Sequence, residues 1–79
     1  MKTGTAQEHR AIENYINGNL TDAKRQAKKL SWRNLACVLM DDYGKTPAMA
    51  RTIADYLKGE GTFQAACDAE HTAKVEARV

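Results

Sequence analysis

The residues best suited by type and spacing to do chemistry are basic ones gathered between positions 23 and 33. This segment holds five cations and no acid: Lys24, Arg25, Lys28, Lys29 and Arg33. At helical spacing Lys24 and Lys28 lie one turn apart, and the other three flank them. Such a face repels itself unless negative charge lies against it, and phosphates or an acidic protein surface would supply that charge. The alternative interpretation is a solvated helix face.

Other residues that could form a metal or catalytic site lack the partners that such chemistry requires. Cys67 and His71 lie one helical turn apart, a spacing that can present two ligands to a metal. A tetrahedral site needs two further ligands, and the sequence offers only Cys37 and one distant histidine. Asp41 and Asp42 are adjacent, so on a helix their carboxylates point in different directions. We therefore expect a protein without metal, cofactor or catalytic residues, and not an enzyme.

A second pattern, around Gly44, resembles a DNA-binding helix-turn-helix in outline. In that hypothesis Thr46, Met49 and Arg51 open the second helix and face the bases. Thr46 and Met49 offer little base-reading chemistry, arginine is represented only by Arg51, and nearby aspartates would repel phosphates. DNA reading through this pair of helices therefore remains an alternative hypothesis.

Capping residues and glycines divide the chain into segments with helical spacing. Each predicted helix begins after a hydroxyl residue that can accept a hydrogen bond from the backbone of the first turn. The five caps are Thr5, Thr21, Ser31, Thr46 and Thr62. Glu8 completes a capping box with the first cap, and Pro47 follows the fourth at a position that favours helix entry. The predicted helices cover about residues 6–17, 22–30, 32–43, 47–58 and 63 onward.

Apolar residues recur at three- and four-residue steps within these segments, and no strand pattern occurs. In the first helix this spacing places Ile12, Tyr15 and Ile16 on one face. The predicted centre of the core consists of Trp32, Leu35, Leu39, Ile53, Leu57 and Phe63. The sequence therefore predicts an all-α fold, a compact bundle of four to five short helices. We expect one domain over residues 1–79, frayed at 1–4 and 76–79.

Composition and charge narrow the class of protein further. The formal net charge is +2 and the hydrophobic fraction is 43%, values that favour a folded domain over disorder. We expect no membrane-spanning segment and no signal peptide, because no apolar run is long enough for the first and the N-terminal residues are polar. Cys37 and Cys67 show no paired spacing, so we expect two buried thiols in a cytoplasmic protein.

Three stretches carry a resemblance to a known group of proteins: INGNLTDAK at 16–24, ADYLKG at 54–59 and FQAACDAE at 63–70. Together they are similar to small accessory proteins of bacteriophages and plasmids, in which an NGNxxDAK opening, a basic helix and a YLKxxGxFQAACDAE tail recur. The resemblance implies a stoichiometric inhibitor of host machinery, such as an anti-CRISPR protein, or a small regulator. Inhibitors that mimic nucleic acid are usually acidic, and the basic segment of this chain departs from that pattern.

The expected function is the binding of a host protein or ribonucleoprotein complex in the host cytoplasm. The basic residues would supply steering and rim contacts, and an exposed aromatic, Tyr15 or Tyr56, would supply an anchor buried on binding. The alternative is a small helix-turn-helix-like regulator that places the basic helix on the phosphates of nucleic acid. A third hypothesis is homodimerisation through the alanine-rich face of the last helix.

Overall fold

The computed structural model describes residues 4–77, with side chains described as far as residue 75. The described chain forms five helices and no strand, which confirms the predicted all-α fold. The helices are α1 (Ala6–Ile16), α2 (Leu20–Ala27), α3 (Trp32–Tyr43), α4 (Pro47–Leu57) and α5 (Phe63–Ala77). Fraying was expected at 1–4 and 76–79, of which residues 1–3 and 78–79 lie outside the described part.

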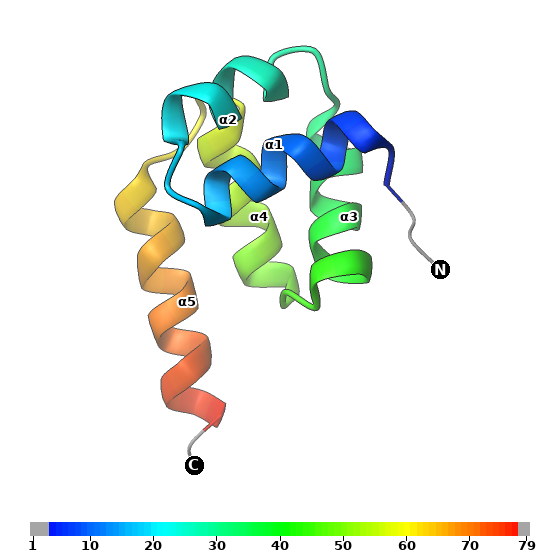
Figure 1. Ribbon diagram of the computed structural model, residues 1–79. Helices are drawn as coiled ribbons and strands as arrows, with labels where there is room; N and C mark the ends of the chain where they lie inside the picture. Colours follow the sequence, from blue (N-terminus) through cyan, green and yellow to red (C-terminus); the bar gives the residue numbers. More distant parts are fainter. Residues whose placement is uncertain (1–3, 78–79) are drawn as a thin grey trace.

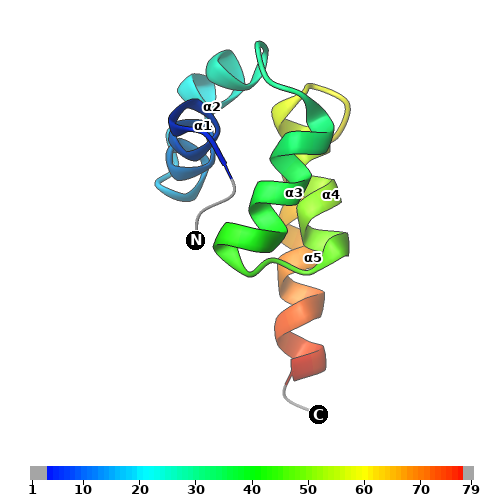
Figure 2. The same ribbon diagram turned by 90° about the vertical axis from the view of Figure 1, so that its right-hand side faces the viewer.

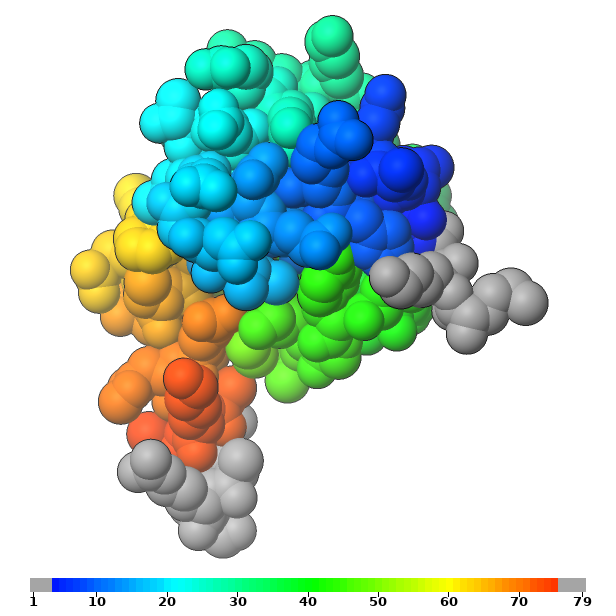
Figure 3. Space-filling view, viewed as in Figure 1, coloured from blue at the N-terminus to red at the C-terminus, as the bar shows by residue number. Residues whose placement is uncertain are grey.

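The helices are arranged as a pair lying across a hairpin, with a fifth helix added at one side (Figure 1). The helices α1 and α2 pack against each other, α1 also contacts α3, and α2 contacts α4. The helices α3 and α4 run side by side in opposite directions (Figures 1 and 2). The helix α5 packs mainly on α4, its Phe63 ring also contacts Tyr15 of α1, and its C-terminal part projects beyond the body (Figure 3).

Local capping explains where four of the five helices begin. The Thr5 hydroxyl accepts from the Glu8 backbone, and the Glu8 carboxylate accepts from the Thr5 backbone, so the predicted capping box is confirmed. Ser31, Thr46 and Thr62 each accept a hydrogen bond from the backbone N–H three residues later. These caps satisfy donors that an uncapped helix start would leave unpaired.

The start of α2 differs from the prediction. The helix begins at Leu20 after Asn19, whose side chain makes no capping hydrogen bond, so the predicted Thr21 cap was wrong. The Asn19 N–H donates to the Asn14 carbonyl, and the Asn19 carbonyl in turn accepts from the Ala23 N–H. The chain reversal after α1 thus leads directly into the new helix, and Thr21 lies within its first turn.

Gly18 and Gly44 lie at chain reversals where a positive φ angle favours glycine. Gly18 follows α1 with φ 86°, and Gly44 ends α3 with φ 64°. At the second reversal the Leu39 carbonyl accepts from the N–H groups of both Gly44 and Lys45. This left-handed ending turns the chain back so that α4 can run beside α3.

The core lies where α1, α3 and α4 meet. Its largest fully buried side chains are Ile12, Leu35, Leu39, Ile53 and Leu57. Phe63 was predicted in the core centre but is 43% exposed, because it begins α5 and only rests its ring against the rings of Tyr15 and Tyr56. Ile16 is 52% exposed rather than inward, because Tyr15 fills the buried position at the end of α1. Trp32 is half-buried at the core edge.

A helix can span a membrane only if it is long and strongly apolar. Within residues that the structure describes, no helix combines the length and the apolar character needed to span a membrane.

Candidate binding surfaces

The five basic residues of the segment 23–33 are distributed over several surfaces instead of one helical face. The helix α2 ends at Ala27, so Lys28 and Lys29 lie in the turn that follows. Arg33 lies on α3, beyond that turn. Lys24 is half-buried, with its ammonium nitrogen 5.0 Å from the centroid of the Tyr56 ring. The single basic face that the spacing predicted is therefore divided by the α2–α3 connection.

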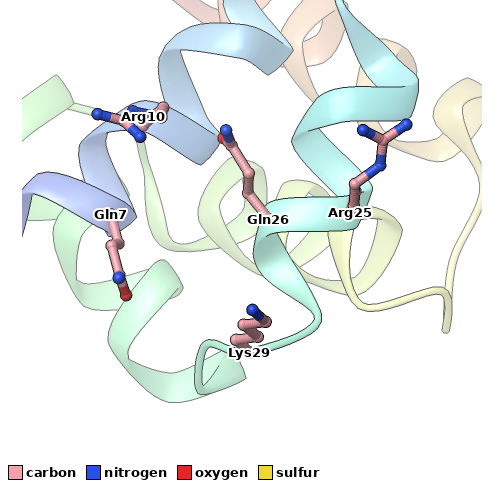
Figure 4. Close-up of a pocket in the computed structure, with 5 residues that line it drawn as sticks. All are labelled: Gln7, Arg10, Arg25, Gln26 and Lys29. Atoms are coloured by element: carbon pink, nitrogen blue, oxygen red, sulfur yellow. The ribbon is translucent and has the colours of Figure 1, made fainter.

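A hollow of about 230 Å³ between α1 and α2 collects three cations, and we call it the cationic trough (Figure 4). Its lining residues are Gln7, Arg10, Arg25, Gln26 and Lys29. The charged groups are spread around the hollow rather than converging on one point (Figure 4). None of the lining residues is acidic.

The charges of the cationic trough are almost uncompensated. Arg25 lies 3.6 Å from Asp22, and both side chains are more than half exposed, so this pair neutralises little of the charge. Among the described residues, no carboxylate forms an ion pair with Arg10 or Lys29. Gln26 accepts a 2.9 Å hydrogen bond from the Asn14 amide, which orients its side chain at the wall of the trough.

Arg10 is the one cation lining the cationic trough that the sequence did not reveal. It lies on α1, far upstream of the basic segment, and it joins Arg25 and Lys29 only because α1 packs against α2. The only local signal was that Gln7 and Arg10 lie on one outward face of α1, three residues apart. That signal is common on solvated helices and does not single out a site.

A second hollow, of about 210 Å³, lies along α3 and α4, and we call it the arginine-rimmed groove. Its lining residues are Trp32, Arg33, Ala36, Cys37, Met40, Pro47, Ala50 and Arg51. Apart from the two arginines, every one of these side chains is largely apolar. Arg33 and Arg51 are exposed, and neither forms an ion pair with a described carboxylate. The groove thus combines an apolar floor with free positive charge at its edge.

The indole of Trp32 is fixed in this groove by a hydrogen bond. Its Nε1–H donates to Asp55 Oδ1 over 2.6 Å, which links the start of α3 to α4. The ring packs partly against the core and partly lines the groove. A fixed and half-buried tryptophan of this kind can contact a partner without a large loss of side-chain freedom.

The two tyrosines proposed as anchors are not exposed. Tyr15 is 8% exposed and Tyr56 is 9% exposed, so the expected role as exposed anchors was wrong. Both rings contact Phe63, which covers them from the start of α5, and their centroids lie 6.0 Å apart. Burial, with a smaller effect from the charge of Glu70, raises the pKa of Tyr15 to about 12. These tyrosines stabilise the junction of α1, α4 and α5.

Of the three residues proposed to read DNA, Thr46 and Arg51 are exposed and Met49 is half-buried. The Thr46 hydroxyl accepts from the Met49 N–H as the cap of α4, and Met49 is half-buried. Arg51 is exposed but lines the arginine-rimmed groove. A DNA-binding helix-turn-helix crosses its two helices at a steep angle, whereas α3 and α4 lie alongside each other (Figure 2). The observed packing does not favour this alternative.

A polar network that the sequence did not reveal connects α1 to α3. His9 Nε2 lies 2.9 Å from Asp42 Oδ2, and its Nδ1 shares a 2.8 Å hydrogen bond with the Tyr43 hydroxyl. The Gly4 N–H also donates to Asp42, over 3.0 Å. Burial, followed by the charge of Glu13, raises the pKa of Tyr43. The side chains of His9 and Asp42 are only 12% and 2% exposed, which indicates a structural link between the helices.

The two cysteines and the alanine-rich helix α5 are the remaining features that the sequence singled out. Both thiols are free and half-buried rather than fully buried, and Cys37 lines the arginine-rimmed groove. No group of three metal-ligating side chains occurs among the described residues. On α5, Ala66 is buried against the core, whereas Ala69 and Ala73 line a shallow hollow beside the start of α4. Homodimerisation through this helix stays a prediction.

Comparison of the chain with protein-family models, with curated proteins and with solved structures gave no match.

Proposed function

We propose that this protein is a non-catalytic binding protein that docks stoichiometrically on an acidic surface of a host protein through the arginine-rimmed groove. The observation that supports this proposal is the combination, in one groove, of an apolar floor with two exposed arginines at its edge that pair with no described carboxylate. Tryptophan, methionine and arginine are among the residue types enriched at protein interfaces, and tryptophan and arginine are also enriched at their energetic centres.

Each part of the groove has a distinct role in this proposal. The Trp32 indole and the Met40 side chain supply apolar area, and the hydrogen bond to Asp55 keeps the indole in place before binding. Arg33 and Arg51 pair with carboxylates of the partner, which steers association and fixes orientation. Arg33 thereby keeps the rim role that the basic segment suggested, and Trp32 replaces the buried tyrosines as the anchor.

The biological setting in this proposal is that of a phage or plasmid accessory protein in the cytoplasm of its host. There the bound partner is a protein or a ribonucleoprotein complex whose action is blocked, as by an anti-CRISPR inhibitor. The resemblance carried by residues 16–24, 54–59 and 63–70 supports this setting.

The proposal is tested by affinity capture of the tagged protein from a bacterial host lysate, with and without nuclease. Wild type is compared with the Arg33→Glu, Arg51→Glu double variant and with Lys74→Glu, an exposed charge reversal on α5 away from the groove. We expect a nuclease-resistant protein that is retained by wild type and by Lys74→Glu but lost by the double variant. Calorimetry with the purified partner should then give a one-to-one complex.

A partner retained equally by the double variant would contradict the role of the groove. Recovery of nucleic acid alone, lost on nuclease treatment, would favour the alternative of a small nucleic-acid-binding regulator.

A further inference from the structure

We propose that the cationic trough is a second and independent binding site, which holds the phosphodiester backbone of double-stranded nucleic acid. The trough lies between α1 and α2, whereas the arginine-rimmed groove lies between α3 and α4. The inference does not depend on the proposed function, because the two surfaces share no residue.

The donor set of the cationic trough suits phosphate oxygens. Arg10 and Arg25 offer planar guanidinium groups that bind phosphate through paired hydrogen bonds, and Lys29 adds a mobile point charge. Gln7 and Gln26 add amide groups, which hydrogen-bond to phosphate and sugar oxygens in nucleic-acid complexes. The lining contains no carboxylate, which would repel a phosphate.

The arrangement of the charges favours an extended polyanion over a single small anion. A site for one phosphate directs its donors at one point, whereas here the cations are spread around the hollow (Figure 4). A nucleic-acid backbone presents successive phosphates along its length, since duplex DNA carries one charge per about 1.7 Å of helix axis, so cations that are spread out can each meet a phosphate.

The absence of aromatic lining favours a duplex over a single strand. Proteins that bind single strands stack the exposed bases on aromatic side chains, and no lining residue of the cationic trough is aromatic. Contacts limited to the backbone also carry no sequence information, so binding is expected to be independent of sequence.

The salt dependence of binding gives a quantitative test. Each phosphate neutralised by a cation contributes about −0.9 to the slope of log K against log salt concentration, so three cations give about −2.7. A fourfold rise in salt then weakens binding about 40-fold. A variant that lacks two of the cations should retain a slope of only about −0.9.

The experiment is a fluorescence anisotropy titration of a labelled, random-sequence DNA duplex of about 20 bp with the full chain, over a range of salt concentrations. The variants are Arg10→Gln with Lys29→Gln in the cationic trough, and the matched pair Arg33→Gln with Arg51→Gln in the arginine-rimmed groove. Circular dichroism verifies that both pairs remain helical. We expect the first pair to lose affinity and most of the salt slope, and the matched pair to bind like wild type.

Three outcomes would overturn the proposal. They are no duplex binding at low salt, equal binding by the trough variant, and equal loss in both variant pairs. Preferential binding of a single-stranded oligonucleotide or of polyglutamate would assign the trough to a different ligand class. None of these results affects capture of a protein partner through the arginine-rimmed groove, so the two proposals fail separately.

Discussion

The Lys58 ammonium group donates a 2.7 Å hydrogen bond to the Leu30 carbonyl. The same nitrogen donates to the carbonyls of Ala27 and Lys28, over 3.0 and 3.3 Å. The last carbonyls of a helix have no partner within it, and a cation at that end also interacts favourably with the helix dipole. One side chain from the end of α4 therefore holds the end of α2 and the turn into α3. Both candidate surfaces depend on this turn, since Lys29 lies within it and Trp32 follows it.

Replacing Lys58 by methionine should lower the free energy of unfolding by about 2 kcal/mol, because charged hydrogen bonds typically contribute about 1.5–3 kcal/mol. The apolar stem is kept, so the change reports the ammonium group and its three carbonyl partners. Urea denaturation followed by circular dichroism measures the effect. The control is Lys74→Met, since Lys74 is exposed on α5. An equally small change in both variants would show that water satisfies the α2 carbonyls equally well.

Removing the carboxylate of Asp55 should destabilise the α3–α4 pair and release the Trp32 indole. We expect Asp55→Ala to cost about 1–3 kcal/mol, because a half-buried indole N–H then loses its acceptor. Asp55→Asn keeps a neutral acceptor and should cost less. Tryptophan fluorescence should report greater solvent exposure in the alanine variant. Asp41→Ala, an exposed aspartate change on α3, is the matched control and should leave the emission unchanged.

Substituting Gly44 by alanine should cost about 1–2 kcal/mol, the typical penalty for a side chain in the left-handed conformation. The backbone there has φ 64°, and an added Cβ would meet no atom within 4 Å. Backbone strain is therefore the only expected cause of the lost stability. Asparagine tolerates this conformation better, and Gly44→Asn should cost less than Gly44→Ala. Thermal unfolding of the two variants checks the order. If the Gly44→Ala variant were as stable as wild type, the assignment of backbone strain at this position would be contradicted.

The fold was largely predictable from the sequence because the helix boundaries depend on local chemistry. Four of the five predicted hydroxyl caps, together with Pro47 and Gly44, act through bonds within a few residues, and the structure confirms them. The exception, Asn19, makes no side-chain cap, so no residue type indicates that helix start. Where the start of a helix depends on a chain reversal, the sequence pattern contains little information about it.

The candidate surfaces were less predictable because they depend on which helices pack together. Arg10 and Lys29 share the cationic trough only through α1–α2 packing, and nothing in their spacing predicts that contact. Tyr56 carries an apolar ring on a helical face, and its burial depends on the position of Phe63 at the start of α5. Local patterns thus indicated the residue types of the surfaces but not their grouping.

The buried hydroxyl of Tyr15 should make the fold sensitive to alkaline pH. The ordinary pKa of tyrosine is 10.0, and burial first, then Glu70, raises the pKa of Tyr15 in the folded state to about 12. The unfolded chain therefore loses this proton at lower pH than the folded chain does. The stability contribution is fully present below pH 10 and is lost as the pH rises from 10 towards 12.

Melting temperatures measured across this range should fall less steeply for Tyr15→Phe than for wild type, because the variant has no hydroxyl to ionise. Tyrosinate absorbance provides the matching readout, since the variant should lack the contribution of Tyr15 near pH 12 that is expected of wild type. Below pH 9 the two proteins should differ by a constant offset, because in that range the hydroxyl is neutral in both folded and unfolded chains. Parallel curves for the two proteins up to pH 12 would show that ionisation of Tyr15 is not linked to unfolding.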